Sequence, residues 1–192
     1  MSNDVPGAAT DFTSLALPLV LSENLATLGY HTMTPIQAES LPLMLAGRDV
    51  IGRGRTGSGK TAAFGLSLLA RLDVKRFCVQ TLVLCPTREL ADQVGEEIRR
   101  LARGCHNVKV LTLCGGVPIG PQRESLFHGA HIIVGTPGRV EDHLKRGSLS
   151  LEALNVLVLD EADRMLDMGF QEALDAIIEA CLLYTSPSPR DS

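Results

Sequence analysis

The 192-residue sequence contains no tryptophan, two tyrosines and five phenylalanines. It also lacks an excess of positive charge, because 22 acidic residues face 18 lysines and arginines and the net charge is −4 at pH 7. Many nucleic-acid-binding proteins carry a basic field over the whole molecule, and this composition excludes one. Any contact with a nucleic acid must therefore come from a local patch.

Two other absences bear on the cellular compartment. The five cysteines are scattered, with no C-x-x-C pair and no metal-like spacing to histidine. Reduced thiols that pack as small apolar side chains are expected, which is typical of a cytoplasmic protein. No apolar run is long enough to cross a membrane, and the polar start of the chain lacks the apolar core of a secretion signal. We therefore predict a cytoplasmic protein without membrane contact.

What the sequence does have is a glycine-rich stretch, GRTGSGKT at residues 54–61, which fits the pattern G-x-x-x-x-G-K-[S/T] at every fixed position. In that pattern backbone N–H groups turn inward around phosphates, the lysine adds a positive charge and the threonine hydroxyl ligates magnesium. A glycine-rich turn that binds nothing is the alternative. We predict that a nucleoside triphosphate and Mg²⁺ bind here, to Gly57, Ser58, Gly59, Lys60 and Thr61.

The apolar pattern predicts helices that alternate with strands. Helices are expected over residues 15–28, 35–45, 61–72, 89–103, 122–127 and 140–145, and buried strands over 49–51, 81–85, 108–114, 131–135 and 154–160. Such alternation predicts an α/β domain with a mostly parallel sheet and helices on both faces. Ligands of these sheets bind beyond the carboxyl ends of the strands, where the glycine-rich stretch and several polar motifs fall.

Two carboxylates follow the last predicted strand. Asp160 can reach a magnesium ion held by Thr61, and Glu161 can orient the water that attacks the γ-phosphorus and accept its proton. Capping the next helix is the alternative role of Asp160. Beside a complete phosphate loop, the functional interpretation is favoured.

Two arginines, Arg88 and Arg139, also follow strands at this edge. Contact with the phosphates of a nucleic acid and an ion pair with a neighbouring carboxylate both remain open for them. Gly115-Gly116 and Pro137-Gly138 either bring backbone amides close to phosphates or simply form turns. A solvated helix face is expected for three nearby residues, Asp142, His143 and Lys145.

In chain order, these motifs resemble those of the DEAD-box RNA helicases. Residues 160–163 spell the signature Asp-Glu-Ala-Asp, and Phe12 with GYHTMTPIQ at residues 29–37 looks like the adenine-reading Q motif. GRTGSGKT resembles motif I, and PTREL, Gly115-Gly116 and TPGR resemble motifs that contact RNA. The stretches CPTRELADQV, LTLCGG and DEADRMLDMGF are most similar to the bacterial DbpA-type members.

The resemblance implies a RecA-like P-loop NTPase domain over residues 12–180, part of an RNA-dependent ATPase that unwinds RNA duplexes locally. It implies ATP as the nucleotide, with Gln37 on the adenine edge, Phe12 against the ring, and Asp163 linking the site to the next motif. Lys60, Asp160 and Glu161 would be the catalytic residues, and Thr61 and Asp160 would hold Mg²⁺. The implied RNA track, with ribosomal RNA and ribosome assembly as its context, comprises Pro86, Thr87, Arg88, Gly115, Gly116, Thr136, Gly138 and Arg139.

Members of the family continue into a strand carrying Ser-Ala-Thr and a second RecA-like domain whose arginines complete the ATP site. Here an abruptly Ser/Pro-rich stretch begins at about residue 181, so we expect residues 181–192 to be non-native and residues 1–11 to be a flexible lead-in. The absent strand would leave a gap beside the strand that feeds the phosphate loop, at a cost in stability. The chain alone is then expected to lack helicase activity, and a non-catalytic nucleotide- or RNA-binding module is the alternative function.

Overall fold

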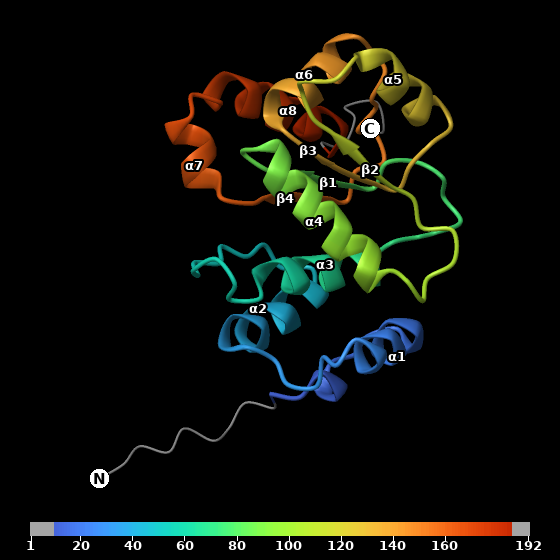
Figure 1. The fold of residues 1–192 in the computed structure, drawn as a ribbon, viewed down its shortest axis with the longest axis vertical. Helices are drawn as coiled ribbons and strands as arrows, with labels where there is room; N and C mark the ends of the chain where they lie inside the picture. Colours follow the sequence, from blue (N-terminus) through green and yellow to red (C-terminus); the bar gives the residue numbers. More distant parts are fainter. Residues whose placement is uncertain (1–9, 186–192) are drawn as a thin grey trace, which may run out of the picture. The chain divides into compact units, whose positions relative to one another are not determined.

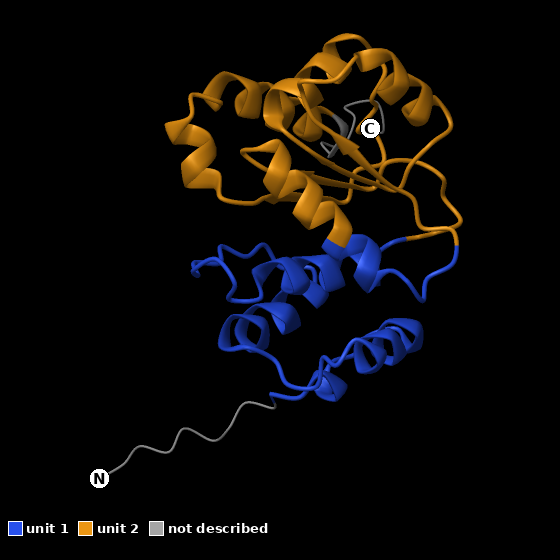
Figure 2. Ribbon diagram, in the orientation of Figure 1, with its two compact units in different colours: residues 1–72, 97–106 blue, residues 73–96, 107–192 orange. Residues whose placement is uncertain are grey.

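The computed structural model describes residues 10–185. It divides into two compact units, which Figure 2 draws in separate colours. Unit 1 comprises residues 1–72 and 97–106, and unit 2 comprises residues 73–96 and 107–192. The division passes through one helix, α4 (Arg88–Leu101), whose start belongs to unit 2 and whose end belongs to unit 1.

Unit 1 is helical. It contains the short 3-10 helix η1 (Phe12–Ser14), α1 (Leu19–Thr27), α2 (Pro35–Leu45) and α3 (Lys60–Ala70). Helix α2 has the predicted bounds, because Thr34 and Gln37 form a capping box and Pro35 occupies the first helical position. Helix α1 starts later than predicted, with Pro18 at its N-cap, since proline disfavours helical geometry in the residue before it.

Long-range hydrogen bonds hold the ends of unit 1. Asp11 and Thr32 form an antiparallel bridge, and the amide of Phe12 donates to the carbonyl of His31 at 3.1 Å. The side chain of Asn24 on α1 donates to the carbonyls of Arg100 and Leu101 at 3.1 and 2.7 Å. Asn24 thereby satisfies carbonyls at the end of α4 that have no partner within the helix.

Unit 2 contains the sheet. Its strands β1 (Thr81–Leu84), β2 (Val110–Leu113), β3 (Ile132–Gly135) and β4 (Val156–Leu159) lie in the order β2-β3-β1-β4, and every pairing is parallel. The last residues of all four strands pair in register. The segments that follow the strands therefore leave the sheet at one edge, and the α/β prediction is confirmed.

Five helices accompany the strands of unit 2 along the chain: the start of α4, then α5 (Ile119–Phe127), α6 (Pro137–Lys145), α7 (Ala162–Asp167) and α8 (Gln171–Thr185). Helices α6 and α8 lie side by side against the sheet (Figure 1). The core joins Leu82 and Leu84 of β1 and Ile133 of β3 to Val140 of α6 and Ile177 of α8. Among the described residues, no helix is both long and apolar enough to span a bilayer.

The predicted strand over residues 49–51 is wrong. These residues have no regular structure, and Ile51 is 93% exposed. A parallel strand needs the N–H and C=O groups of a neighbour, and no described residue pairs with this segment. The phosphate loop is therefore followed by a helix, as predicted, but not preceded by a strand.

Both predicted chain ends fall partly outside the described residues, which exclude residues 1–9 and 186–192. At the start, the amide of Met33 donates to the carbonyl of Thr10 at 2.6 Å. At the end, α8 continues past the change in composition near residue 181, and Cys181 lies in the core.

Candidate functional site

The phosphate loop lies in unit 1, directly before α3. Gly57 and Gly59 have φ angles of +81° and +90°, in the left-handed region where side chains are strained. A Cβ atom on Gly59 would also collide with the amide of Gln37, whereas nothing lies within 4 Å of one on Gly57. The ammonium of Lys60 donates to the carbonyl of Gly54 at 2.6 Å, which leaves two of its three N–H donors for a phosphate.

Gln37 ties helix α2 to this loop. Its Oε1 accepts from the amide of Thr34 at 2.9 Å, and its Nε2 donates to the carbonyl of Gly59 at 3.1 Å. The hydroxyl of Thr34 donates to the carbonyl of Ser58 at 2.8 Å. Sequence reasoning gave Gln37 only an adenine contact and missed this link. The capping-box spacing of Thr34 and Gln37 was the available signal for its structural part.

A cavity of about 600 Å³ borders the same loop in unit 1. Thr34 at the N-cap of α2 and Ile36 and Ser40 within that helix line it, together with the segment 50–54 and Ser58. The hydroxyl of Ser58 is buried and has no hydrogen-bond partner among the described residues. A buried polar atom without a partner is costly, so this orphaned hydroxyl fits a loop built to bind a ligand. Thr61 follows at the start of α3, half-buried.

Phe12 is only 4% exposed and offers little surface to a base. Its ring meets Tyr30 edge to face, with 5.9 Å between centroids. The hydroxyl of Tyr30 donates to Glu97 at 2.7 Å, and Arg100 lies 5.7 Å over its ring. Burial, followed by the carboxylate of Glu97, raises the pKa of Tyr30. Tyr30 is the more exposed member of the pair, and sequence reasoning overlooked it although it lies inside the Q-type segment.

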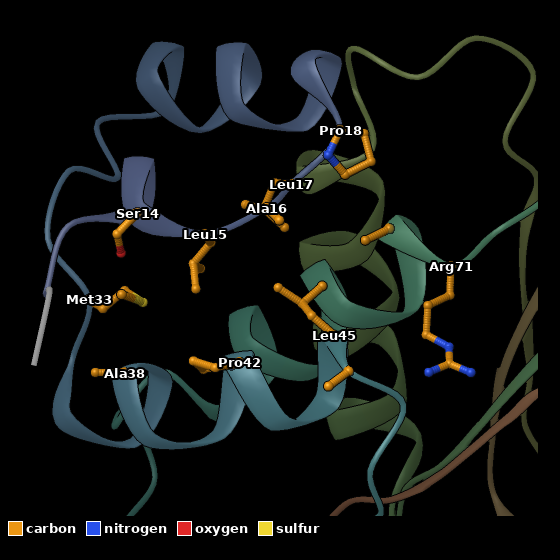
Figure 3. Close-up of a pocket in the computed structure, with 12 residues that line it drawn as sticks. Ser14, Leu15, Ala16, Leu17, Pro18, Met33, Ala38, Pro42, Leu45 and Arg71 are labelled. Carbon is orange, nitrogen blue, oxygen red and sulfur yellow. The ribbon is translucent and has the colours of Figure 1, made fainter.

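A larger, mostly apolar groove of about 970 Å³ also lies in unit 1 (Figure 3). Residues 14–18 and Met33 form one side, and Pro42 and Leu45 of α2 form the other. Arg71 is the one charged residue among those that line it. None of the predicted site residues borders this groove.

The carboxylate pair lies in unit 2, where β4 ends. The amide of Asp160 donates to the carbonyl of Leu84 at 2.9 Å, so Asp160 continues the sheet by one residue, and it is only 9% exposed. Glu161 has φ +52° and occupies the N-cap of α7 without a capping side-chain bond. The alternative in which Asp160 caps the helix is therefore wrong. Asp163 is exposed in the first turn of α7.

The side chain of Glu161 pairs with Arg164 on the next turn. Its Oε2 accepts from Arg164 at 3.1 Å, in a pair that solvent reaches. Near it, burial and then the charge of Asp160, with a smaller effect of Glu161, raise the pKa of the Cys85 thiol well above its usual range. Cys85 is thus an inert, protonated thiol, and negative charge gathers at the end of β1. Such a field suits a cation.

The PTREL motif follows β1 at the same edge. Pro86 is buried, and the hydroxyl of Thr87 accepts from the amide of Leu90 at 3.3 Å, which caps α4. Arg88 is exposed and pairs with Asp92 at 3.8 Å. An exposed pair of this length contributes little free energy, so Arg88 remains available to another anion.

The glycine pair and the TPGR motif follow β2 and β3. Gly115 and Gly116 form a bend, and a Cβ atom on Gly116 would lie 3.9 Å from Nη1 of Arg88. The amide of Thr136 donates to the carbonyl of Leu113 at 3.1 Å, and Gly138 is exposed in the first turn of α6. Arg139 donates to Gln122 and to the carbonyl of Val117, each at 2.9 Å, so neutral groups hold it.

The expectation that His143 lies on a solvated face is wrong, because its side chain is fully buried. It bonds Gln122 and Ser148, at 3.0 and 2.8 Å. Burial, followed by the charge of Arg139, lowers the pKa of His143, so the ring is neutral at pH 7. The signal was its position three residues after the buried Val140, on the same face of α6.

The candidate residues thus form two groups. Unit 1 holds the phosphate loop with Gln37 and Phe12, and unit 2 holds the carboxylates and the implied RNA track. Thr61 carries a hydroxyl oxygen and Asp160 carboxylate oxygens, and Mg²⁺ prefers oxygen donors of these kinds.

Residues 34–190 match the family model described as DEAD/DEAH box helicase. The chain belongs to this family. It is 62% identical over 170 residues to the ATP-dependent RNA helicase DbpA of Escherichia coli K12, covering 88% of this chain and 37% of that protein. It is 47% identical over 169 residues to the DEAD-box ATP-dependent RNA helicase CshA of Bacillus cereus, covering 88% and 32%. The family resemblance read from the motifs is confirmed.

The fold of this DEAD-box chain is also that of a solved relative. The crystal structure of a DEAD box protein from the hyperthermophile Methanococcus jannaschii superposes with a TM-score of 0.84 and 39% identity, over 89% of this chain and 47% of that chain. The DEAD-box chain spans about a third of the length of the curated relatives it matches.

Proposed function

We propose that this chain is the ATP-binding domain of an RNA-dependent ATPase that locally unwinds RNA duplexes. The observation that carries the proposal is the phosphate loop at the start of α3, joined by Gln37 to the Q-type segment in a chain of the DEAD/DEAH box helicase family. Relatives of this chain are named ATP-dependent RNA helicases, which supports the same activity here. A second RecA-like domain in the full-length protein would complete the ATP site beyond residues 12–180.

In this proposal the phosphates of ATP bind at the N-terminus of α3. The amides of Gly57 and Gly59 and the free donors of Lys60 would bind the phosphates, where the helix dipole also favours negative charge, whereas the amide of Ser58 donates to the carbonyl of Arg55 at 3.2 Å. The orphaned hydroxyl of Ser58 supports a ligand at this loop. Gln37 binds the adenine edge through the hydrogen-bonding capacity that Thr34 and Gly59 leave unused.

Hydrolysis requires the carboxylates that follow β4 as well as the phosphate loop. Thr61 and Asp160 would hold Mg²⁺, which when bound neutralises charge on the β- and γ-phosphates. Glu161 orients the attacking water and accepts its proton, and Lys60 stabilises the charge that develops on the γ-phosphate. Asp163 links this group to the following motif. The left-handed backbone of Glu161 supports a functional role, because strain of this kind is retained where a side chain must be aimed.

RNA is bound through its backbone in this proposal. The track comprises Pro86, Thr87, Arg88, Gly115, Gly116, Thr136, Gly138 and Arg139. The weakly paired Arg88 and the neutral partners of Arg139 support it, since both cations stay available to phosphate. Backbone contacts allow little sequence selectivity. On the similarity to the DbpA-type relatives, we extend the proposal to ribosomal RNA, a role in ribosome assembly and a cytoplasmic location.

The variant Glu161→Gln tests the enzymatic reading in the full-length protein. It should abolish ATP turnover while the dissociation constants for ATP and RNA change less than about twofold, because the amide keeps the shape but cannot accept the proton. Glu172→Gln, on the exposed first turn of α8, is the matched control and should keep the wild-type rate. Undiminished turnover in Glu161→Gln would contradict the assignment. A wild-type protein that binds ATP and RNA without turnover would favour the non-catalytic module.

A further inference from the structure

A cluster of neutral groups in unit 2 holds Arg139. Its Nη1 donates to Oε1 of Gln122 and its Nη2 to the carbonyl of Val117, both at 2.9 Å. Gln122 lies on α5, which is adjacent to α6 in Figure 1, and its Nε2 donates to the carbonyl of Cys114 at 3.0 Å. The guanidinium is thus fixed at two points, one of them on the segment that follows β2.

His143 fixes the amide of Gln122 from another side. Its Nε2 lies 3.0 Å from Oε1 of Gln122, and its Nδ1 lies 2.8 Å from the hydroxyl of Ser148. Because Gln122 uses its nitrogen as donor to Cys114, its oxygen faces the ring, and Nε2 of His143 carries the proton. Oε1 of Gln122 then accepts from both Arg139 and His143, which fills its two lone pairs.

The partners of Arg139 orient its charge without cancelling it. Arg139 forms no ion pair with any residue that the structure describes, in contrast to Arg88, which pairs with Asp92. Three of the five N–H donors of its guanidinium have no partner within the described part of the chain. A phosphate oxygen is the acceptor that such a fixed guanidinium, which forms no ion pair among the described residues, fits best.

We propose that Gln122 and His143 are positioning residues, which hold the guanidinium of Arg139 in place for an RNA phosphate while leaving its full charge. This rests on the proposed function, in which Arg139 contacts the RNA backbone. Without Gln122 the guanidinium must be ordered when RNA binds. Ordering one such side chain weakens binding by about three- to tenfold.

A double-mutant cycle in the full-length protein tests the proposal, with the dissociation constant of single-stranded RNA measured over a range of salt concentrations. Gln122→Met should raise that constant about three- to tenfold and leave the salt slope unchanged, since the charge remains. Arg139→Gln should raise it and reduce the slope by about 0.7, because one phosphate contact is lost. In the Arg139→Gln background, Gln122→Met should have no further effect. Gln171→Met, on the exposed start of α8, is the matched control.

The outcomes separate this inference from the proposed function. An equal loss from Gln122→Met in both backgrounds would show a general structural role and overturn the inference. If Arg139→Gln left RNA binding unchanged, Arg139 would not contact RNA, and that part of the proposed function would be wrong instead. Where Gln122→Met does not fold, His143→Phe keeps the ring volume but cannot donate to Gln122. It should then show a smaller loss with the same dependence on Arg139, and a loss independent of Arg139 would overturn the inference.

Discussion

At the scale of single residues, buried polar side chains of this chain act as connectors. Gln37, Asn24 and Gln80 each bond at least two backbone groups. Each of these hydrogen bonds contributes modestly to the free energy of folding. Removing the side chain costs more wherever it leaves a backbone group without a partner. Substitutions at these positions should therefore lower the free energy of unfolding by more than the small exposed area of the side chains indicates.

Gln80 provides a direct case in unit 2. It is 1% exposed, accepts from the amide of Asp73 at 3.0 Å, and donates to the carbonyls of Asp73 and Arg76, each at 2.8 Å. Gln80→Leu should lower the free energy of unfolding by about 1–3 kcal/mol, since the amide of Asp73 loses its partner and the two carbonyls keep only their backbone donors, Arg76 and Cys78. Urea unfolding checks this. The control Gln93→Leu, at an exposed position on α4, should change stability by less than about 0.5 kcal/mol.

The two loop glycines should respond differently to alanine. Both occupy the left-handed region, which costs a non-glycine residue about 1–2 kcal/mol, but only Gly59 faces the amide of Gln37. Gly57→Ala should destabilise unit 1 by about 1 kcal/mol, and Gly59→Ala by more, with a further loss of ATP affinity. Equal effects on unfolding in urea would show that Gln37 does not pack against the loop.

His143 should make stability depend on pH. Burial, then Arg139, lower its pKa, with Arg146 and Arg123 acting in the same direction and Asp142 opposing them. The unfolded chain therefore binds the proton more readily than the folded one. The contribution of neutral His143 to the free energy of unfolding is complete above the pKa of the unfolded state, about 6.5. It is lost as the pH falls through the lower pKa of the folded state. The difference in unfolding free energy between wild type and His143→Phe should shrink from pH 7.5 to pH 5.5. A constant difference would contradict this.

At the scale of elements, helix starts and buried strands were readable because their signals are local. Thr34 with Gln37 and Pro35 marks the start of α2, and the run Thr81–Leu84 is apolar enough to predict a strand buried on both faces. The segment 49–51 carries the same apolar signal, yet a strand also requires a partner, and partners are not local. The hydrogen bond between Gln37 and Gly59 joins residues that are 22 apart in the sequence, so a local pattern does not predict it either.

The N-cap of α2 should connect helix stability to the loop. The Thr34 hydroxyl accepts from Gln37 and donates to Ser58, so Thr34→Ala removes a cap and a tether together. We expect a loss of about 1–2 kcal/mol in unfolding free energy and weaker ATP binding. Thr27→Ala at the end of α1, whose hydroxyl bonds the carbonyl of Glu23, is the matched control and should leave ATP binding unchanged. Equal ATP affinity in both variants would rule out the tether.

At the scale of the whole molecule, the chain distributes its candidate residues between two units. The sequence motifs predicted the family, the parallel sheet and the residues at the carboxyl ends of its strands. They did not predict the contacts among side chains, such as the burial of His143 against Gln122 or of Phe12 against Tyr30. Those contacts depend on which elements pack together, and single-residue patterns on one element do not contain that information.

If this chain is the ATP-binding domain that we propose, ATP turnover by the full-length protein depends on RNA, and its steady-state rate shows whether it does. The rate is measured with single-stranded RNA, with DNA of the same sequence, and without nucleic acid. We expect many-fold stimulation by RNA and little by DNA. A rate that RNA leaves unchanged, or that DNA raises equally, would contradict the proposal.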